Sequence, residues 1–142
     1  MIQVRTLTAA ELELVDRHLP LSRLDQGGGE YLVAWEDGLP VGHAHLDWRP
    51  DPPEVQDVFV DSAHRRRGIA ARLSEAAEQR VRARGLGRIA LDVDVENAAA
   101  RALYAKLGYQ PHGEPRRHAG SILLRGEPFS FDVVLIDLVK QL

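Results

Sequence analysis

The chain has 142 residues, of which 44% are apolar and 27% are charged, and it contains no cysteine. This composition is typical of a soluble globular protein, and the length predicts one domain over residues 1–142. The missing cysteines exclude disulfides, thiolate metal sites and a cysteine nucleophile. No apolar run approaches the roughly 20 residues of a membrane span, and the first residues lack the pattern of a signal peptide, so we expect a cytoplasmic protein without membrane contact.

The charges are distributed unevenly along the chain. Residues 1–62 hold 4 Arg against 12 Asp or Glu, whereas residues 63–142 hold 14 Arg or Lys against 9 Asp or Glu. This asymmetry suits an anionic ligand on one side and a cationic ligand on the other. Eight arginines between Arg65 and Arg88 raise the alternative of a nucleic-acid surface. The net charge of −3 and the pI near 6.1 argue against it, since such domains are usually strongly basic.

Hydrophobic periodicity and turn residues indicate the elements in chain order. We expect strands at 2–5, 31–36, 40–47, 55–60 and 89–93, a strand that starts at Tyr109, and a closing strand at 131–139. Helices are expected from a capping box at Thr8 to Pro20, from Ile69 to Gly85, and from Asn97 to Gly108. Residues 111–120 are expected to form a polar loop. The predicted order is β-α-β-β-β-α-β-α-β-β, an α/β fold whose mixed sheet carries helices on both faces.

The segment from Arg65 to Ala70, Arg-Arg-Arg-Gly-Ile-Ala, follows a predicted strand and opens a predicted helix. The first N–H groups of a helix lack partners within the helix, and the helix dipole favours negative charge there. Gly68 has no side chain and Ala70 only a methyl group, so a phosphate group could approach the main chain closely. The segment predicts an anion site, with a solvated helix start as the alternative.

A second informative segment runs from Asn97 to Tyr109. Asn97 is a good N-cap, the alanines that follow are strong helix formers, and Gly108 stands where a helix commonly ends. Asn97 and Tyr104 are seven residues apart and should therefore share one face of a short helix.

Together the two segments resemble the GNAT superfamily, the acyl-CoA-dependent N-acyltransferases. The first matches the family's coenzyme-binding pattern Arg/Gln-x-x-Gly-x-Gly/Ala at Arg65, Gly68 and Ala70, and the second its Asn-x6-Tyr-x3-Gly-Phe/Tyr pattern at Asn97, Tyr104, Gly108 and Tyr109. The element order also agrees with the family, with one departure. About nine residues stand where the family usually has a second helix before its second strand, which predicts a comparatively open acceptor cleft.

The resemblance implies that acetyl-CoA is the co-substrate and that much of its site is main chain. The backbone of Val58, Phe59 and Val60 would pair with the pantetheine arm, and an N–H near Val60 would face the thioester carbonyl. The residues implied to hold the pyrophosphate are Arg66, Arg67, Gly68, Ile69, Ala70 and Ala71, with Arg65 beside them. For the three arginines, a solvated helix cap is the alternative.

Tyr104 stands where the family carries its general acid. A phenol with a reference pKa near 10 can protonate a departing thiolate, whose reference pKa is about 8.5. An aromatic ring packed on the sheet is the alternative for Tyr104. Asn97 is either a plain N-cap or an N-cap that also contacts the pantetheine.

An amine acceptor must lose a proton before it attacks, and two carboxylates are candidates for the base. By resemblance, Glu54 stands where histone-type members of the family carry a catalytic glutamate. Asp92, on the neighbouring strand, stands where members that acetylate protein N-termini carry theirs. A water chain without a dedicated base is the third alternative.

The resulting prediction is an N-acetyltransferase that moves the acetyl group of acetyl-CoA to a primary amine by direct attack in a ternary complex. The main alternative is a non-catalytic CoA-binding regulatory module of the same fold. His43 and His45 alternate on one predicted strand with a spacing that metal ligands also use. No third ligand lies nearby in the sequence, so no metal is expected, and the two histidines are assigned to an ordinary half-exposed strand or to the lining of the acceptor cleft. The sequence leaves the acceptor's identity and a homodimer open.

Overall fold

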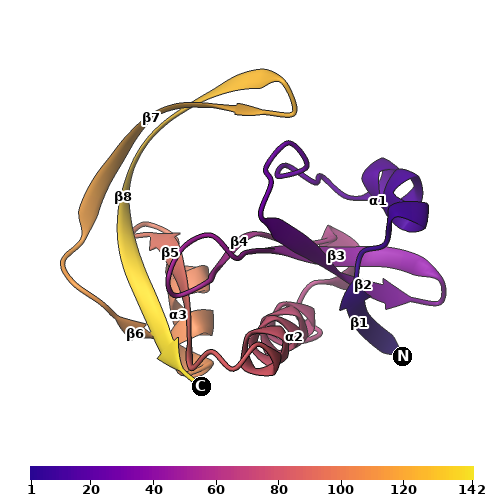
Figure 1. Cartoon of the computed structure of the whole chain (residues 1–142), viewed down its shortest axis with the longest axis horizontal. Helices are drawn as coiled ribbons and strands as arrows, with labels where there is room; N and C mark the ends of the chain where they lie inside the picture. Colours follow the sequence, from indigo (N-terminus) through magenta and orange to yellow (C-terminus); the bar gives the residue numbers. More distant parts are fainter.

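The computed structural model describes all 142 residues and consists of one curled eight-stranded sheet with three α-helices (Figure 1). The strands are β1 (Ile2–Thr6), β2 (Gly29–Glu36), β3 (Leu39–Asp47), β4 (Glu54–Val60), β5 (Arg88–Asp94), β6 (Gln110–Pro111), β7 (Arg116–Leu124) and β8 (Glu127–Gln141). The helices are α1 (Leu12–His18), α2 (Ile69–Ala83) and α3 (Ala98–Lys106), with short 3-10 turns at Ala9–Glu11 and Ser62–His64.

The strands follow the order β1-β2-β3-β4-β5-β8-β6, and β7 pairs with β8 outside this path. β4 and β5 run parallel, whereas every other neighbouring pair is antiparallel. The fold is therefore the predicted mixed α/β sheet. None of the three α-helices combines the length and the apolar composition of a transmembrane span.

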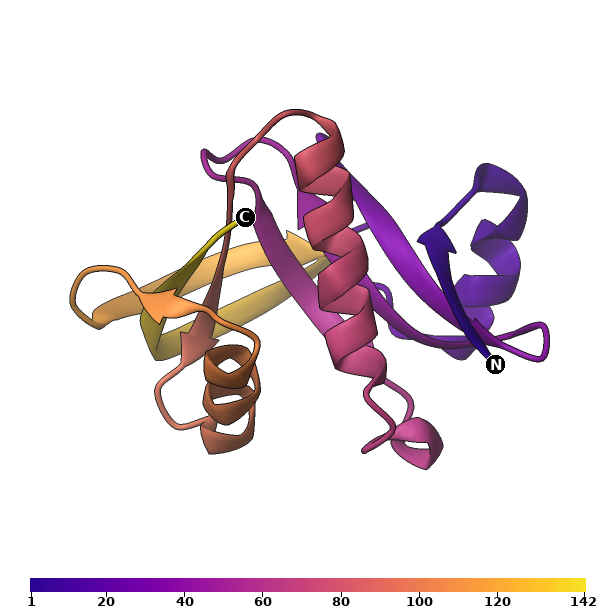
Figure 2. The same cartoon turned by 90° about the horizontal axis from the view of Figure 1, so that it is seen from below.

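Alternation along β2 explains how the helices cover the sheet. Leu32 and Ala34 pack into the larger core with the apolar side of α2, whereas Val33 and Trp35 pack with Val15 of α1 on the other face. Successive strand residues point to opposite faces, so α1 and α2 lie on opposite sides of the sheet, as expected. Figure 2 shows α2 and α3 in front of the strands, on the face away from α1.

The structure differs from the sequence prediction in the C-terminal part of the chain, where residues 111–120 were expected to form a polar loop. Residues 116–124 form β7, which pairs along its whole length with β8, so the order contains one more strand than predicted. Arg125 and Gly126 connect the two strands with left-handed φ values of 56° and 79°, as in a two-residue hairpin turn. Most of β7 and the first half of β8 are exposed on both faces. Along β7 the apolar-polar alternation that identifies half-buried strands is missing, whereas β8 alternates from Phe129 to Val133 and was predicted as a strand from residue 131.

The hairpin of β7 and β8 arches over the sheet and reaches the segment between α1 and β2 (Figure 1). Arg125 donates to both carboxylate oxygens of Asp16, at 2.8 and 2.9 Å, and to the carbonyl of Leu21 at 3.0 Å. The N–H of Gly126 donates to Asp25 at 3.0 Å. The tip of the hairpin thus contacts α1 and the short segment before β2. The expectation of a comparatively open acceptor cleft stays a prediction.

Candidate active site

β4 and β5 separate almost as soon as they meet. They share one register pair, Glu54 with Ala90, next to a hydrogen bond of 2.9 Å from the Ala90 N–H to the Pro53 carbonyl. Beyond this point a cleft of about 510 Å³ opens between the end of β4, the start of α2 and one side of α3. Residues 58–60, 64–66, 68–71, 97, 99, 100, 103 and 104 line it. The two sequence motifs therefore meet in one cleft.

A β-bulge in β4 precedes the cleft. His43 pairs with Phe59 and His45 with Gln56, so two residues of β4, at 57 and 58, stand opposite Ala44 alone. Asp57 has a left-handed φ of 51°, which costs a residue with a side chain roughly 1–2 kcal/mol. A bulge bends its strand and redirects the residues that follow. Here those residues are the ones that line the cleft.

Hydrogen bonds to the Asp57 carboxylate hold this bulge in place. Its Oδ2 accepts from the Ser22 N–H at 3.0 Å and from the Tyr31 hydroxyl at 2.5 Å, and that hydroxyl accepts from the Arg23 N–H at 2.8 Å. Burial, together with the Asp57 carboxylate, raises the pKa of Tyr31, so the phenol stays a donor. The sequence analysis missed Asp57 and Tyr31, because no local pattern links residues that are 26 positions apart.

Gly68 occupies the start of α2 with a left-handed φ of 74°, and a Cβ there would meet no atom within 4 Å. The space beside this helix start is therefore open to a ligand that the first N–H groups could bind. Arg65 and Arg66 line the same end of the cleft, and Arg65 donates to the Val60 carbonyl at 3.1 Å. Arg67 instead donates to Glu36 at 2.9 Å and does not line the cleft.

The third side of the cleft comes from α3. Asn97 caps this helix by accepting from the Ala100 N–H at 3.1 Å, and it also lines the cleft. Tyr104 lines the cleft with only 6% of its surface exposed and packs edge-on against Tyr109, with the ring centroids 5.6 Å apart. Burial raises the pKa of Tyr104. Its phenol is therefore protonated at neutral pH and able to donate.

The two carboxylates considered as bases lie together on the face of the sheet away from α2. Val55 and Leu91 point into the core with α2, so their neighbours Glu54 and Asp92 point to the other face. Asp137 of β8 stands opposite Asp92 in register. Burial, followed by the charge of Asp92, raises the pKa of Glu54 to about 7.

Arg116 of β7 balances part of this negative charge. It donates to Asp137 at 2.9 and 3.0 Å and to Asp92 at 3.4 Å. Burial raises the pKa of Asp92, and Arg116 opposes that effect. Because Arg116 engages Asp92 and Asp137 directly, Glu54 is the carboxylate of this group that carries no ion pair. Neither Asp137 nor Arg116 was singled out from the sequence.

The two histidines of β3 are buried, so the expectation of a half-exposed strand was wrong. His43 is fully buried and stacks on Phe59 at 5.7 Å, and the Nδ1 atom of His45 lies 2.9 Å from the side-chain nitrogen of Gln56. Burial lowers the pKa of both imidazoles. The structure contains no group of three or more His, Cys, Asp or Glu side chains arranged to hold a metal ion.

An open helix start beside two parallel strands that separate agrees with the arrangement that the resemblance to acyl-CoA-dependent transferases implies. The profile of the acetyltransferase (GNAT) family matches residues 3–109. The chain therefore belongs to the GNAT family, which confirms the resemblance read from the two motifs and the prediction of an acetyl-CoA-dependent N-acyltransferase.

Individual relatives agree with this membership. The chain is 37% identical over 108 residues to the L-amino acid N-acetyltransferase AaaT of Escherichia coli (strain K12), covering 72% of this chain and 67% of the relative. It is 39% identical over 67 residues to the mycothiol acetyltransferase of Nocardia farcinica, covering 47% of this chain but only 22% of that protein. A GNAT family acetyltransferase from Elizabethkingia anophelis with acetyl-CoA bound superimposes with a TM-score of 0.75 at 18% identity, over 99% and 98% of the two chains.

Proposed function

We propose that this protein transfers the acetyl group of acetyl-CoA to a primary amine by direct attack in a ternary complex. The observation that carries the proposal is the separation of β4 and β5 after one register pair, with a helix-start anion site at one end of the opening and Glu54 at the strands' point of contact. The cleft offers a path for an acyl-CoA, and the other face of the sheet offers an approach for the amine.

In this proposal the coenzyme is held mainly by main chain. The first N–H groups of α2 and the side chains of Arg65 and Arg66 bind the pyrophosphate. The bulged end of β4 pairs with the pantetheine arm, and an N–H near Val60 stabilises the oxyanion that develops on the thioester carbonyl. Asn97 contacts the same arm while it caps α3.

We assign the two proton transfers to Glu54 and Tyr104, because each has the protonation state at neutral pH that its role requires. Glu54, with a pKa of about 7, is partly ionised at neutral pH and accepts a proton from the ammonium of the acceptor. The free amine attacks the carbonyl carbon, the carbon–sulfur bond breaks, and Tyr104 donates its proton to the departing thiolate. The attacking nitrogen then loses its second proton, which returns to the Tyr104 phenolate, and Glu54 releases its proton to solvent, so the products are the amide and the CoA thiol. The chain has no cysteine, so an acetyl-cysteine intermediate is excluded and direct attack is the proposed route.

A panel of primary amines, assayed for release of free CoA thiol, tests the proposal. We expect acetyl-CoA to bind in calorimetry, and at least one amine to release thiol in an acetyl-CoA-dependent reaction. Glu54→Gln should lower kcat/KM in that reaction without weakening acetyl-CoA binding. Binding of acetyl-CoA without thiol release from any amine would contradict the proposal and favour a regulatory CoA-binding module.

A further inference from the structure

We propose that the concave face of the β7–β8 hairpin is the acceptor subsite, and that it takes a primary ammonium ion attached to an aromatic body. This inference rests on the proposed function, because it places the acceptor on the face of the sheet where Glu54 lies. The proposal assigns the ammonium group to the carboxylates and the aromatic body to a row of side chains on the hairpin.

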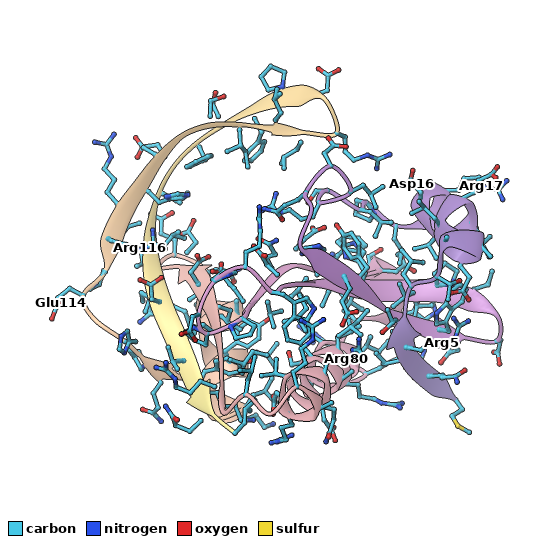
Figure 3. All side chains as sticks on the ribbon, viewed as in Figure 1. Arg5, Asp16, Arg17, Arg80, Glu114 and Arg116 are labelled. Carbon is cyan, nitrogen blue, oxygen red and sulfur yellow. The ribbon has the colours of Figure 1, made fainter.

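The hairpin register defines which residues form this face. Arg116 pairs with Leu135, and the register continues without interruption to the turn. Residues of β7 and β8 that share the side of Arg116 therefore point the same way. They include His118, Gly120, Ile122, Phe129, Phe131 and Val133, with Leu124 and Glu127 next to the turn. Because Arg116 donates to Asp92 and Asp137, this face turns toward the carboxylates. Figure 3 labels Arg116 on the hairpin ribbon.

Three of these side chains form a continuous aromatic row. His118 stacks on Phe131 with ring centroids 4.5 Å apart, and Phe129 lies 6.5 Å from Phe131 with nearly parallel rings. Gly120 stands opposite Phe131, where a Cβ would lie 3.4 Å from the ring. Phe129 is nevertheless 51% exposed. Exposed aromatic side chains gathered on one face favour contact with a ligand.

The hairpin holds this row in a fixed position. One end continues into the main sheet, and the other is fixed by the bonds of Arg125 to Asp16 and Leu21 and of Gly126 to Asp25. Because both ends are anchored, little of the binding free energy is needed to order the ribbon around a ligand. Figure 1 shows the arch standing over the sheet with its concave side toward β4.

Charge complementarity decides what kind of ligand this face binds. At the inner end, the carboxyl groups of Glu54, Asp92 and Asp137 are accompanied by one cation, Arg116. An ammonium group is favoured there, whereas a carboxylate on the acceptor would be repelled. Farther along the hairpin the face is aromatic as far as Phe129, and its next carboxylate is that of Glu127 beside the turn. The acceptor is therefore an arylalkylamine-like cation with its amine toward Glu54.

The outer face of the same hairpin offers a matched control. Leu123 is 67% exposed and belongs to β7, but it points to the convex side. Phe131→Ala and Phe129→Ala remove rings of the row, and Leu123→Ala removes a comparable apolar group from the other side. All three residues lie on a ribbon that is open to solvent on both faces, so the variants are expected to fold, which circular dichroism checks.

The test measures binding of 2-phenylethylamine to the CoA-loaded protein by calorimetry, with propylamine and spermidine as comparison ligands. We expect 2-phenylethylamine to bind at least 10-fold more tightly than propylamine. Phe131→Ala and Phe129→Ala should each reduce that preference about 10-fold, and Leu123→Ala should leave it unchanged. Equal affinity for the aromatic and aliphatic amines, or an equal loss in all three variants, would overturn the subsite.

The same experiment separates this inference from the proposed function. Aromatic amine binding that depends on Phe131, without release of CoA thiol, would support the subsite and contradict the transfer reaction. Thiol release from spermidine or propylamine with no effect of Phe131→Ala would support the transfer and overturn the subsite. Sedimentation of the wild type and Phe131→Ala gives the remaining outcome. Loss of a dimer in the variant, with no amine bound by the wild type, would assign the aromatic row to a subunit interface and overturn the proposal.

Discussion

Glu54→Gln should make the protein more stable at alkaline pH while it impairs catalysis. The pKa of Glu54 is about 7 in the folded chain, compared with 4.5 for a free glutamate. Since the folded-state pKa is raised, the contribution of Glu54 to stability is greatest below pH 4.5 and is lost as the pH rises through 7. Gln resembles the protonated acid at every pH, so the difference between variant and wild type should grow across this window.

The two pKa values set the magnitude. An ionised carboxylate whose folded-state pKa lies that far above its unfolded value disfavours the folded state by up to about 3 kcal/mol. We therefore expect Glu54→Gln to raise the free energy of unfolding by about 2–3 kcal/mol at pH 8.5 and to change it little at pH 4.5. Glu54 is only partly buried, and solvent screening lowers the cost of its charge, so we expect a value nearer ~2 than ~3 kcal/mol.

Urea denaturation of both proteins at pH 4.5, 6.5 and 8.5 measures the effect. Glu114→Gln is the matched control, because Glu114 lies exposed in the loop before β7 (Figure 3). It should show no pH-dependent gain. A free-energy difference between Glu54→Gln and wild type that is the same at all three pH values would refute the reasoning, and so would a gain that is largest at pH 4.5.

The other predictions concern the coenzyme cleft and the bulge. Gly68→Glu should abolish acetyl-CoA binding in calorimetry. Gly85, just beyond the far end of α2, has a similar φ of 76° and equally open surroundings, so Gly85→Glu should lower the stability by a similar amount but keep the binding. Equal acetyl-CoA affinities in the two variants would place the pyrophosphate elsewhere. Tyr104→Phe should lower kcat by roughly 10²-fold with little change in acetyl-CoA affinity, and wild-type turnover would leave Tyr104 as a packing residue. Asp57→Ala should lower kcat about 10-fold more than Asp57→Asn in the thiol-release assay, because Asn tolerates a left-handed φ and keeps a hydrogen-bond acceptor. Equal kcat values would mean that the bulge does not depend on the hydrogen bonds to residue 57.

The sequence by itself determined the features that depend on local chemistry. The start of α2 at Gly68, the cap of α3 at Asn97 and its end near Gly108 follow from backbone freedom and capping within a few residues. The α/β class and most strand positions follow from the periodicity of apolar residues. Each of the two sequence motifs, at 65–70 and 97–109, can likewise be recognised within a short stretch of sequence. The resemblance to the family then predicted that they meet in one cleft.

Only the tertiary structure decided which distant residues meet. The hydrogen bond that holds the bulge at Asp57 comes from Tyr31 on another strand. The carboxylates of Glu54 and Asp92 lie near Arg116 because β8 pairs with both β5 and β7. β7 escaped prediction because a strand open to solvent on both faces has no buried side to impose alternation, whereas most of β8 was predicted as the closing strand. Strand pairing across long sequence separations is set by packing of the whole sheet, and no short window of the sequence records it.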